Sequence, residues 1–317
     1  MIKVGISSCV LGQKVRFDGG HKLSRFVDRV LTPYFSFQPI CPEVAINMGV
    51  PRPTVRLLFK NQTNLLVDTK THEKDFTDQM NDFSEKKINQ LNEQNQMCGY
   101  IVCAKSPTCG MERVKLYREN GNTIPGGTPG LFTGKLIQKM PWLPVEEDGR
   151  LCDLVLRRNF IVRVFALNDY YKNINLQSKR KDYINFHTRY KYLLLSHCQE
   201  GYKELGHLVA HICEYNNEEF YHIYRQKFMD TLRKHANRKT NTNVLMHIQG
   251  HYKQILDKNE KKELSEIILK YRNSILPIES PMTLLKHYQN KYYDKFIECQ
   301  SFLSPYPEEL NIRYGMQ

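Results

Sequence analysis

Three cysteines of this 317-residue chain occupy positions suited to metal ligation. Cys9, Cys41 and Cys109 each follow a short apolar segment, and Pro or Gly flanks two of them, which leaves backbone room around a bulky inorganic group. Three thiolates on converging loops suit an iron-sulfur cluster. A cubane cluster with only three protein ligands keeps one iron open, and that iron is a soft Lewis acid matched to a sulfur ligand.

The spacing of these cysteines leaves two other interpretations open. They lie far apart and form no CxxC pair, so a zinc site or three unrelated buried cysteines fits the same pattern. Structural disulfides are not expected in a cytoplasmic chain, because that compartment keeps thiols reduced. The other six cysteines are interpreted as small buried hydrophobes: Cys98, Cys103, Cys152, Cys198, Cys213 and Cys299.

Alternating strand and helix patterns are expected to place the three cysteines at one edge of a sheet. Short apolar segments at 2–7, 35–40, 64–67 and 99–104 predict buried strands. The segment 73–97 has apolar residues at roughly helical spacing and predicts a helix. This alternation favours a parallel, Rossmann-like α/β sheet, in which function collects on the loops that follow the strands.

The composition changes near residue 150. Residues 119–130 are predicted as a Gly- and Pro-rich loop without the Lys-Ser/Thr spacing of a phosphate-binding P-loop. Residues 1–150 carry a net charge of +5 and residues 151–317 carry +8. The second part also holds 9 of the 11 His and 16 of the 19 Tyr residues. We therefore predict two domains, 1–150 and 151–317.

The second domain is predicted to be all-α. The strand pattern disappears after about residue 155, and amphipathic patterns replace it. Helices are expected at 157–172, 179–197, 217–236, 258–273 and 281–297.

The overall composition predicts a cytoplasmic protein with a polyanionic partner. No stretch approaches the roughly 18–20 apolar residues of a membrane span, so no membrane partner is expected. The opening MIKVGISSCV reads as a strand and lacks the features of a signal peptide. The net charge of +13 attracts polyanions such as nucleic acid. The oligomeric state has no signal in the sequence.

Motifs around the three cysteines resemble the TudS family of thiouracil desulfurases. The matching segments are SSCVLGQKVRFDGGHK (7–22), CPEVAINMGVPRPTVRL (41–57) and AKSPTCGMERVKLY (104–117). The helical half resembles the domain fused to it in long members, at 186–197, 247–253, 280–288 and 304–313. This arrangement resembles the tRNA 4-thiouridine desulfidases of the RudS type. Phe17 and Thr108 stand where Tyr and Ser are usual, and neither change removes a ligand or a reactive group.

The resemblance implies a 4Fe-4S cluster held by Cys9, Cys41 and Cys109, with one open iron. It also implies catalytic roles for Glu43, in C-P-E, and Ser106, in S-P-T-C. A thiocarbonyl sulfur would bind the open iron, which makes sulfide a better leaving group when water attacks the carbon. Glu43 is placed to deprotonate that water or relay a proton, and Ser106 to hydrogen-bond the pyrimidine or share the relay. The net reaction is non-redox hydrolysis of C=S to C=O with release of sulfide.

Other residues of the same motifs are candidate substrate contacts: Ser8, Arg16, Asp18, His21 and Lys105. Asp18 alternatively caps a turn at the two following glycines. Arg16 and Lys105 alternatively have a solvated surface role. By residue type alone, Glu43 also fits a surface carboxylate and Ser106 a turn residue before proline.

Basic clusters in the second domain predict RNA binding, at Lys179, Arg180, Lys181, Arg189 and Lys191. Phosphate contacts from Lys and Arg dominate nucleic-acid affinity, and aromatic faces stack on unpaired bases. Aromatic side chains are interleaved with these cations: Tyr183, His187, Tyr190 and Tyr192. A solvated helix face is the alternative. The resemblance implies that this domain holds tRNA while the first domain acts on the base.

The sequence therefore predicts a desulfidase of 4-thiouridine in tRNA, with a thiolated pyrimidine reached by local extrusion from the tRNA fold. Two alternatives remain open. One is a desulfurase of free thiouracil or thionucleosides. The other is a non-catalytic RNA-binding protein with a structural or sensory cluster, which would normally have four protein ligands.

Overall fold

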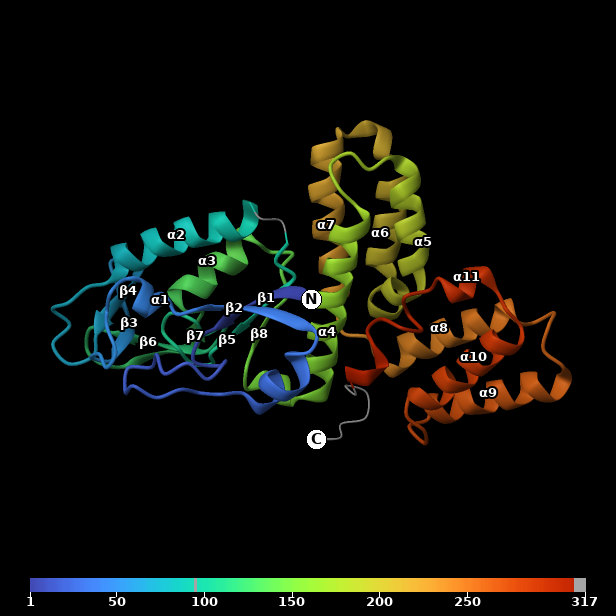
Figure 1. Ribbon diagram of the computed structural model, residues 1–317, viewed down its shortest axis with the longest axis horizontal. Helices are drawn as coiled ribbons and strands as arrows, with labels where there is room; N and C mark the ends of the chain where they lie inside the picture. Colours follow the sequence, from blue (N-terminus) through green and yellow to red (C-terminus); the bar gives the residue numbers. More distant parts are fainter. Residues whose placement is uncertain (94–95, 311–317) are drawn as a thin grey trace. The chain divides into compact units, whose positions relative to one another are not determined.

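The computed structural model of the protein describes residues 1–93 and 96–310. They fall into two compact units that divide between Phe160 and Ile161. This division lies within helix α4 (Leu154–Asn173), somewhat after the boundary predicted near residue 150. Strands and helices alternate in the first unit, and the second is helical, which confirms the predicted fold class (Figure 1).

The first unit contains a four-stranded parallel sheet in the order β2-β1-β5-β8. Its strands are β1 (Ile2–Ser7), β2 (Phe35–Ile40), β5 (Gly99–Val102) and β8 (Val145–Glu147). Ser7 lies opposite Ile40 in the register, and Ile6 lies opposite Ile101. The C-terminal ends of β1, β2 and β5 therefore meet at one edge, where a parallel sheet places its functional loops.

The central strand β1 is almost entirely buried, as its apolar sequence predicts. Val4 and Ile6 are fully buried, and Gly5 lies opposite Tyr100 of β5. A Cβ atom on Gly5 would lie 2.3 Å from the Tyr100 ring, so the close approach of these strands requires glycine. Tyr100 also packs against Phe132, with ring centroids 5.9 Å apart.

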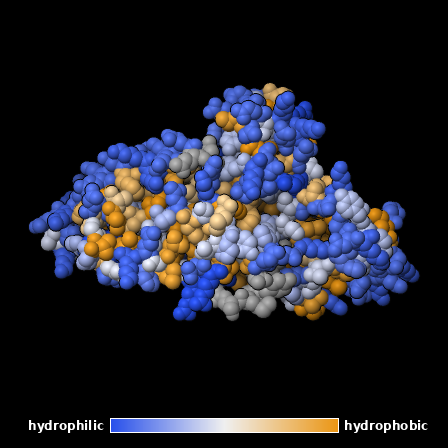
Figure 2. All heavy atoms as spheres, viewed as in Figure 1, coloured by the Kyte–Doolittle hydropathy of each residue, from blue (hydrophilic) through white to orange (hydrophobic). Residues whose placement is uncertain are grey.

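Two helices, α2 (Thr77–Glu93) and α3 (Leu131–Lys139), lie side by side on one side of the strands in Figure 1. The rings of Phe83 and Phe132 stack between them at 6.1 Å. Figure 2 shows a mostly hydrophilic surface over α2, as expected for an amphipathic helix with one buried side. The unit also includes the π-helix η1 (Val27–Leu31) and the 3-10 helix η2 (Arg150–Cys152).

The helix predicted at 73–97 is confirmed, but it starts only at Thr77. Asp68 delays the start, because its carboxylate accepts hydrogen bonds from the backbone N–H groups of Lys70, Thr71 and Lys74 and so holds a turn there. Residues 94–95 of the predicted segment lie outside the described residues.

A second four-stranded sheet, in the order β4-β3-β6-β7, was not predicted. Its strands are β3 (Val55–Lys60), β4 (Thr63–Asp68), β6 (Val114–Arg118) and β7 (Thr123–Thr128). The strand predicted at 64–67 is confirmed as part of β4, but it pairs antiparallel with β3. Asn61 and Gln62 between these strands both have positive φ, as the tight two-residue turn of a hairpin requires.

The prediction of a loop at 119–130 is wrong for half of the segment, because Thr123–Thr128 form strand β7 in a hairpin with β6. Gly and Pro usually mark loops, which misled the prediction. Here Gly127 has φ of 68° and lies so close to Arg113 that a Cβ atom would be 2.6 Å from the Arg113 Cα. The register shifts at this point, as at a β-bulge, where glycine is common.

After α4 the second unit consists of helices: α5 (Arg180–His197), α6 (Gln199–Ala210), η3 (Ile212–Glu214), α7 (Asn217–Arg233), α8 (Arg238–His251), α9 (Lys258–Arg272), α10 (Glu279–Lys291), α11 (Lys295–Glu298) and η4 (Glu308–Leu310). All five predicted helices are present, although 281–297 is divided where Asp294 caps α11. Helices α6 and α8 were missed. The last residues of the 304–313 motif, from 311 onward, lie outside the described residues.

None of the described helices has the length and apolar character needed to cross a membrane.

Candidate active site

A cavity of about 400 Å³ opens at the edge of the parallel sheet where β1, β2 and β5 end. Pockets that bind small molecules typically have volumes of roughly 300–1,000 Å³. The loops after these three strands supply most of the wall, and every lining residue belongs to the first unit. The three predicted cysteines, Cys9, Cys41 and Cys109, all line this cavity. Cys103 lines it as well.

The first wall is the loop after β1, where Cys9 lies in a tight turn. Its carbonyl accepts hydrogen bonds from the N–H groups of Gly12 at 3.2 Å and Lys22 at 2.8 Å. Gly12 has φ of 93°, a conformation that favours glycine. The Ser8 N–H donates to the Ile40 carbonyl at 3.0 Å and ties the loop to β2. These bonds fix the backbone of Cys9 beside the cavity.

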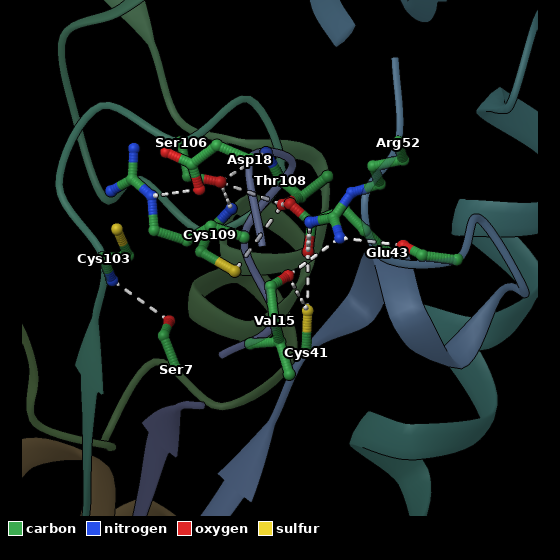
Figure 3. A network of polar contacts seen from close by, with 12 residues as sticks. Ser7, Val15, Asp18, Cys41, Glu43, Arg52, Cys103, Ser106, Thr108 and Cys109 are labelled. Atoms are coloured by element: carbon green, nitrogen blue, oxygen red, sulfur yellow. Dashed lines mark hydrogen bonds and ion pairs between the residues drawn. The ribbon is translucent and has the colours of Figure 1, made fainter. Parts of the chain in front are cut away.

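The second wall begins where β2 ends and the short helix α1 (Pro42–Ala45) starts. Cys41 is the N-cap of α1, and proline follows it at the first helical position, where its missing N–H costs nothing. Glu43, in the same turn, is only 8% exposed. The Cys41 Sγ donates a hydrogen bond to Glu43 Oε2 at 3.3 Å, so the predicted ligand and the predicted catalytic carboxylate are in contact (Figure 3).

Arg52 approaches the same carboxylate. Its Nη2 lies 3.8 Å from Glu43 Oε2, and its Nη1 donates to the carbonyls of Val15 at 2.8 Å and Gly49 at 3.2 Å. Val15 belongs to the loop after β1, so Arg52 joins that loop to Glu43 (Figure 3). Both side chains are buried, so solvent screens this ion pair little.

The third wall is the loop after β5, which folds around the Ser106 side chain. Ser106 Oγ accepts hydrogen bonds from the N–H groups of Cys109 at 3.1 Å and Thr108 at 3.3 Å. The Gly110 N–H donates to the Ser106 carbonyl at 2.8 Å, and a Cβ on Gly110 would lie 2.9 Å from that oxygen. Serine before proline therefore shapes the turn, as the alternative interpretation held, and it also lines the cavity.

Thr108 links the two predicted catalytic residues. Its Oγ1 donates to Glu43 Oε1 at 2.5 Å and lies 3.0 Å from Ser106 Oγ. A hydroxyl has one proton, so when Thr108 donates to Glu43 it accepts from Ser106. The side chains thus form an ordered chain from Ser106 through Thr108 to Glu43 (Figure 3). Thr108 is fully buried, so water does not replace these bonds.

The cavity favours neutral thiols at the three predicted ligand positions. Burial, and then the nearby Glu43, raise the pKa of Cys41 to about 12 and raise the pKa of Cys109 well above its usual range. A hydrogen bond with Cys103, together with burial, raises the pKa of Cys9. Ionising these thiols therefore needs compensation by positive charge, which a bound metal group provides.

Cys103 has a different environment from the other cavity thiols. A hydrogen bond from Cys9 and the charge of Lys22 lower its pKa. The Lys22 Nζ lies 2.9 Å from Asp148 Oδ2, and the Ala104 N–H donates to Asp148 Oδ1 at 2.8 Å. Cys103 is buried, as predicted, but it also lines the cavity. Of the other cysteines predicted to be buried, Cys98 and Cys198 are buried, whereas the prediction is wrong for Cys152, Cys213 and Cys299, which are exposed.

The predicted substrate contacts divide into two groups. Ser8, Arg16 and Lys105 line the cavity. Asp18 and His21 are not among its lining residues. Asp18 Oδ1 instead accepts from the Gly20 N–H at 2.9 Å, as in the turn-capping alternative, and His21 Nδ1 accepts from a backbone N–H two residues later at 3.2 Å.

Four lining or supporting residues were missed as functional: Lys22, Arg52, Cys103 and Thr108. All four lie inside or directly beside the three motifs, and this nearness to the motifs is the one sequence feature that could have identified them. Their partners come from other segments of the chain, which spacing does not reveal.

The predicted RNA-binding cations of the second unit occupy two settings. Lys179, Arg180 and Lys181 lie exposed at the start of α5. Arg189 is half-buried and its Nη2 lies 2.6 Å from Asp169 Oδ2. Lys191 Nζ lies 5.4 Å from the centre of the Tyr192 ring. The first three therefore remain the more accessible to a polyanion.

Three of the four aromatic side chains interleaved with these cations belong to the core, and the fourth, His187, is half-buried with its Nδ1 3.3 Å from the Tyr224 hydroxyl. Tyr183, Tyr190 and Tyr192 are all less than 5% exposed, and Tyr183 packs edge-on against Phe220 at 4.7 Å. The expectation that these rings stack on RNA bases is therefore wrong. Burial in a helical bundle explains their helical spacing equally well.

Comparison with known families matches both halves of the chain. Residues 4–148 match the family model described as 2-thiouracil desulfurase. Residues 191–307 match one described as a protein of unknown function, DUF1722. Within the described residues, no three His, Cys, Asp or Glu side chains are arranged to hold a single metal ion.

Two known proteins resemble this chain. The uncharacterized protein YbgA of Escherichia coli (strain K12) is 33% identical over 156 residues, which cover 49% of this chain and 92% of YbgA. A solved structure titled [4Fe-4S]-dependent thiouracil desulfidase TudS is 25% identical, with a TM-score of 0.38, and the similarity covers 48% of this chain and 93% of that one.

The first unit is therefore a 2-thiouracil desulfurase domain, and the chain is an enzyme that removes sulfur from a thiolated pyrimidine. The chain belongs to the family of YbgA, whose length it covers almost completely.

Proposed function

We propose that the protein hydrolyses the thiocarbonyl of 4-thiouridine in tRNA. Water supplies the oxygen of the new carbonyl, and the sulfur leaves as sulfide, so C=S and H₂O become C=O and H₂S without net oxidation or reduction. One observation carries this proposal. The three cysteines and the chain from Ser106 through Thr108 to Glu43 meet at one cavity.

The donor set of the cavity fits a 4Fe-4S cluster. Cys9, Cys41 and Cys109 are soft sulfur donors, and such ligands are typical of iron-sulfur sites. A four-iron cluster is bound by ligands spaced around it, so its thiolates need not converge on one point as they do for a single ion. These three cysteines would hold the cluster. When bound with one iron free of protein ligands, it supplies a soft Lewis acid for the thiocarbonyl sulfur.

Glu43 is arranged to accept a proton. Its Oε1 accepts from Thr108 and its Oε2 lies beside Arg52, partners that suit a proton-accepting carboxylate. The Cys41 thiol also donates to Oε2, but it would give up that proton on binding the cluster, which leaves Oε2 open to accept another. A carboxylate within reach of water in the cavity can act as a general base on the attacking water. Arg52, at 3.8 Å, holds the carboxylate in this orientation.

The hydroxyl chain gives the proton a route back to the leaving group. Ser106 lines the cavity, whereas Thr108 is fully buried behind it. Once Glu43 has taken the proton from water, the two hydroxyls reverse: Glu43 donates to Thr108, Thr108 donates to Ser106, and Ser106 donates its own proton to the departing sulfur. This assigns Glu43 to water activation and Ser106 to protonation of the leaving group.

Positive side chains at the cavity offset the charge of the thiolates. Arg16, Lys22 and Lys105 all line it. Ser8 and Arg16 would position the pyrimidine, and Arg16 is itself held by Asp18 Oδ1 at 3.7 Å. Asp18 and His21 would act through the turn that they hold.

Basic residues support a nucleic-acid substrate. The chain has a net charge of +13, and Lys179, Arg180 and Lys181 lie exposed on the helical unit. Lys and Arg contacts to phosphates supply most of the affinity for RNA. Arg189 and Lys191 would contribute less, since neighbouring side chains already engage them. A cytoplasmic location, where tRNA is found, stays a prediction.

The desulfuration assay is the direct test. The full chain, reconstituted with its cluster without oxygen, should release one sulfide for each 4-thiouridine lost from tRNA, without an added reductant. Glu43→Gln should keep the cluster absorption and lose at least about 100-fold in turnover, because a general base contributes that much. Cys9→Ala should lose both cluster and turnover. Sulfide release from free 4-thiouracil but none from tRNA would instead favour the small-molecule alternative.

Thr108 provides a test of the hydroxyl chain. Thr108→Val keeps the shape of the side chain but breaks the link between Ser106 and Glu43, so turnover should fall by about 10- to 100-fold. Thr108→Ser retains the hydroxyl and should stay within about 3-fold of the wild type. Turnover and KM are measured separately, because a broken relay lowers kcat. Equal activities of the two variants would contradict the relay.

Cys103 tests whether the cluster has a fourth protein ligand, as a structural cluster normally would. Its thiol is the fourth that lines the cavity. With three ligands, Cys103→Ala should retain the iron content and cluster absorption of the wild type. Cys98→Ala is the control, because Cys98 is also buried but does not line the cavity. Loss of iron in Cys103→Ala alone would indicate a four-cysteine cluster and contradict the open iron.

A further inference from the structure

A basic groove leads away from the cavity over the second sheet of the first unit. A hollow of about 330 Å³ shares four lining residues with the cavity: Thr54, Val55, Lys105 and Pro107. Its floor comes from β3 and β6. A further hollow of about 290 Å³ continues it toward β7 and shares Arg113 and Lys115 with the first. The two hollows and the cavity thus adjoin one another along the surface.

Four cations line this basic groove: Arg56, Lys105, Arg113 and Lys115. None of the described residues that line the two hollows is acidic. Lys105 and Lys115 are exposed and form no ion pair within the described ranges 1–93 and 96–310. By contrast, Lys60 at the end of β3 lies 2.6 Å from Glu119 and is neutralised there.

The two other cations are only partly engaged. Arg113 is 79% exposed at its side chain and lies 3.3 Å from Glu112, but Glu112 also binds Arg150 at 2.6 Å. Arg56 lies over the Tyr117 ring at 4.9 Å, and its Nη2 contacts His72 Nε2. These partners carry no negative charge, so the guanidinium keeps its positive charge in the groove.

Two of these cations have strained backbone conformations that the surrounding structure maintains. Lys105 has φ of 63° and Arg113 has φ of 55°, left-handed conformations that cost a non-glycine residue roughly 1–2 kcal/mol. The close approach of Gly127 holds Arg113, and Gly110, whose Cβ would lie 3.3 Å from the Lys105 nitrogen, packs against the other turn. Strain maintained by the surrounding structure is typical of functional positions.

We propose that this basic groove binds the RNA backbone next to the thiolated nucleotide, a proposal that rests on the proposed function. The groove starts at the cavity that receives the base, so the chain on one side of that nucleotide must leave along the adjacent surface. A row of cations without carboxylates matches successive phosphates, and such grooves track single strands. The first unit therefore has its own RNA contact, separate from the helical unit.

Binding of a fluorescein-labelled single-stranded RNA of about 12 nucleotides with a central 4-thiouridine tests this proposal. Anisotropy is measured on the full chain at several salt concentrations. The double variant Arg113→Gln with Lys115→Gln should bind roughly 10-fold more weakly, and the slope of log affinity against log salt should fall by about 0.7 for each phosphate that the protein no longer neutralises. The single variant Lys115→Glu should weaken binding further than Lys115→Gln does.

The control is Lys86→Gln with Lys87→Gln, which removes the same charge from α2 and should leave affinity and slope unchanged. Thermal unfolding of each variant checks the fold. Binding and salt slope equal to wild type in the groove variant would overturn the proposal, as would an equal weakening in the control. Sulfide release is measured on the same samples. If the groove variants bind RNA more weakly but the wild type releases no sulfide, only the proposed function is contradicted. If the wild type releases sulfide but the groove variants bind RNA as tightly as it does, only the groove proposal is contradicted.

Discussion

The buried carboxylate of Glu43 is the interaction on which the site depends. A carboxylate removed from water must be hydrogen-bonded or paired, and its partners come from several parts of the chain. Thr108 reaches it from the loop after β5, and Arg52 connects it to the Val15 carbonyl in the loop after β1. The Cys41 thiol, two residues earlier in the chain, donates to it at 3.3 Å. The three loops that carry the cysteines are therefore linked through one charged group, and moving any of them exposes or unpairs it.

Site residues that are positioned by the strand directly before them were predictable from the sequence. Residues whose role depends on contacts with distant parts of the chain were not. Cys9, Cys41 and Cys109 follow strands whose apolar runs are visible in the sequence, and parallel strands necessarily end at one edge. Thr108 was noted only as a departure from serine, because its importance depends on a bond to a residue 65 positions away. Cys103 looks like any buried cysteine until the fold places it against Cys9.

The same distinction explains the errors in the fold. Strand β7 was predicted as a loop because its glycines and proline indicate turns, yet pairing with β6 overrides that preference. In the helical unit, the spacing of Tyr183, Tyr190 and Tyr192 fits RNA stacking and core packing equally, and burial decides for the core. Surface charge is less ambiguous, since exposed cations remain accessible in both units. The path of a long polyanion over each unit is thus better defined by exposed Lys and Arg than by aromatic residues.

In the proposed mechanism, the carboxylate and hydroxyl groups of this cavity direct water to a thiocarbonyl carbon. Turnover in water enriched in oxygen-18, followed by mass spectrometry of the pyrimidine product, measures this directly. The new carbonyl should carry one oxygen-18 atom for each sulfide released, with no electron donor present. A product without the heavy oxygen, or sulfide that forms only when a reductant is added, would rule out hydrolysis at this site.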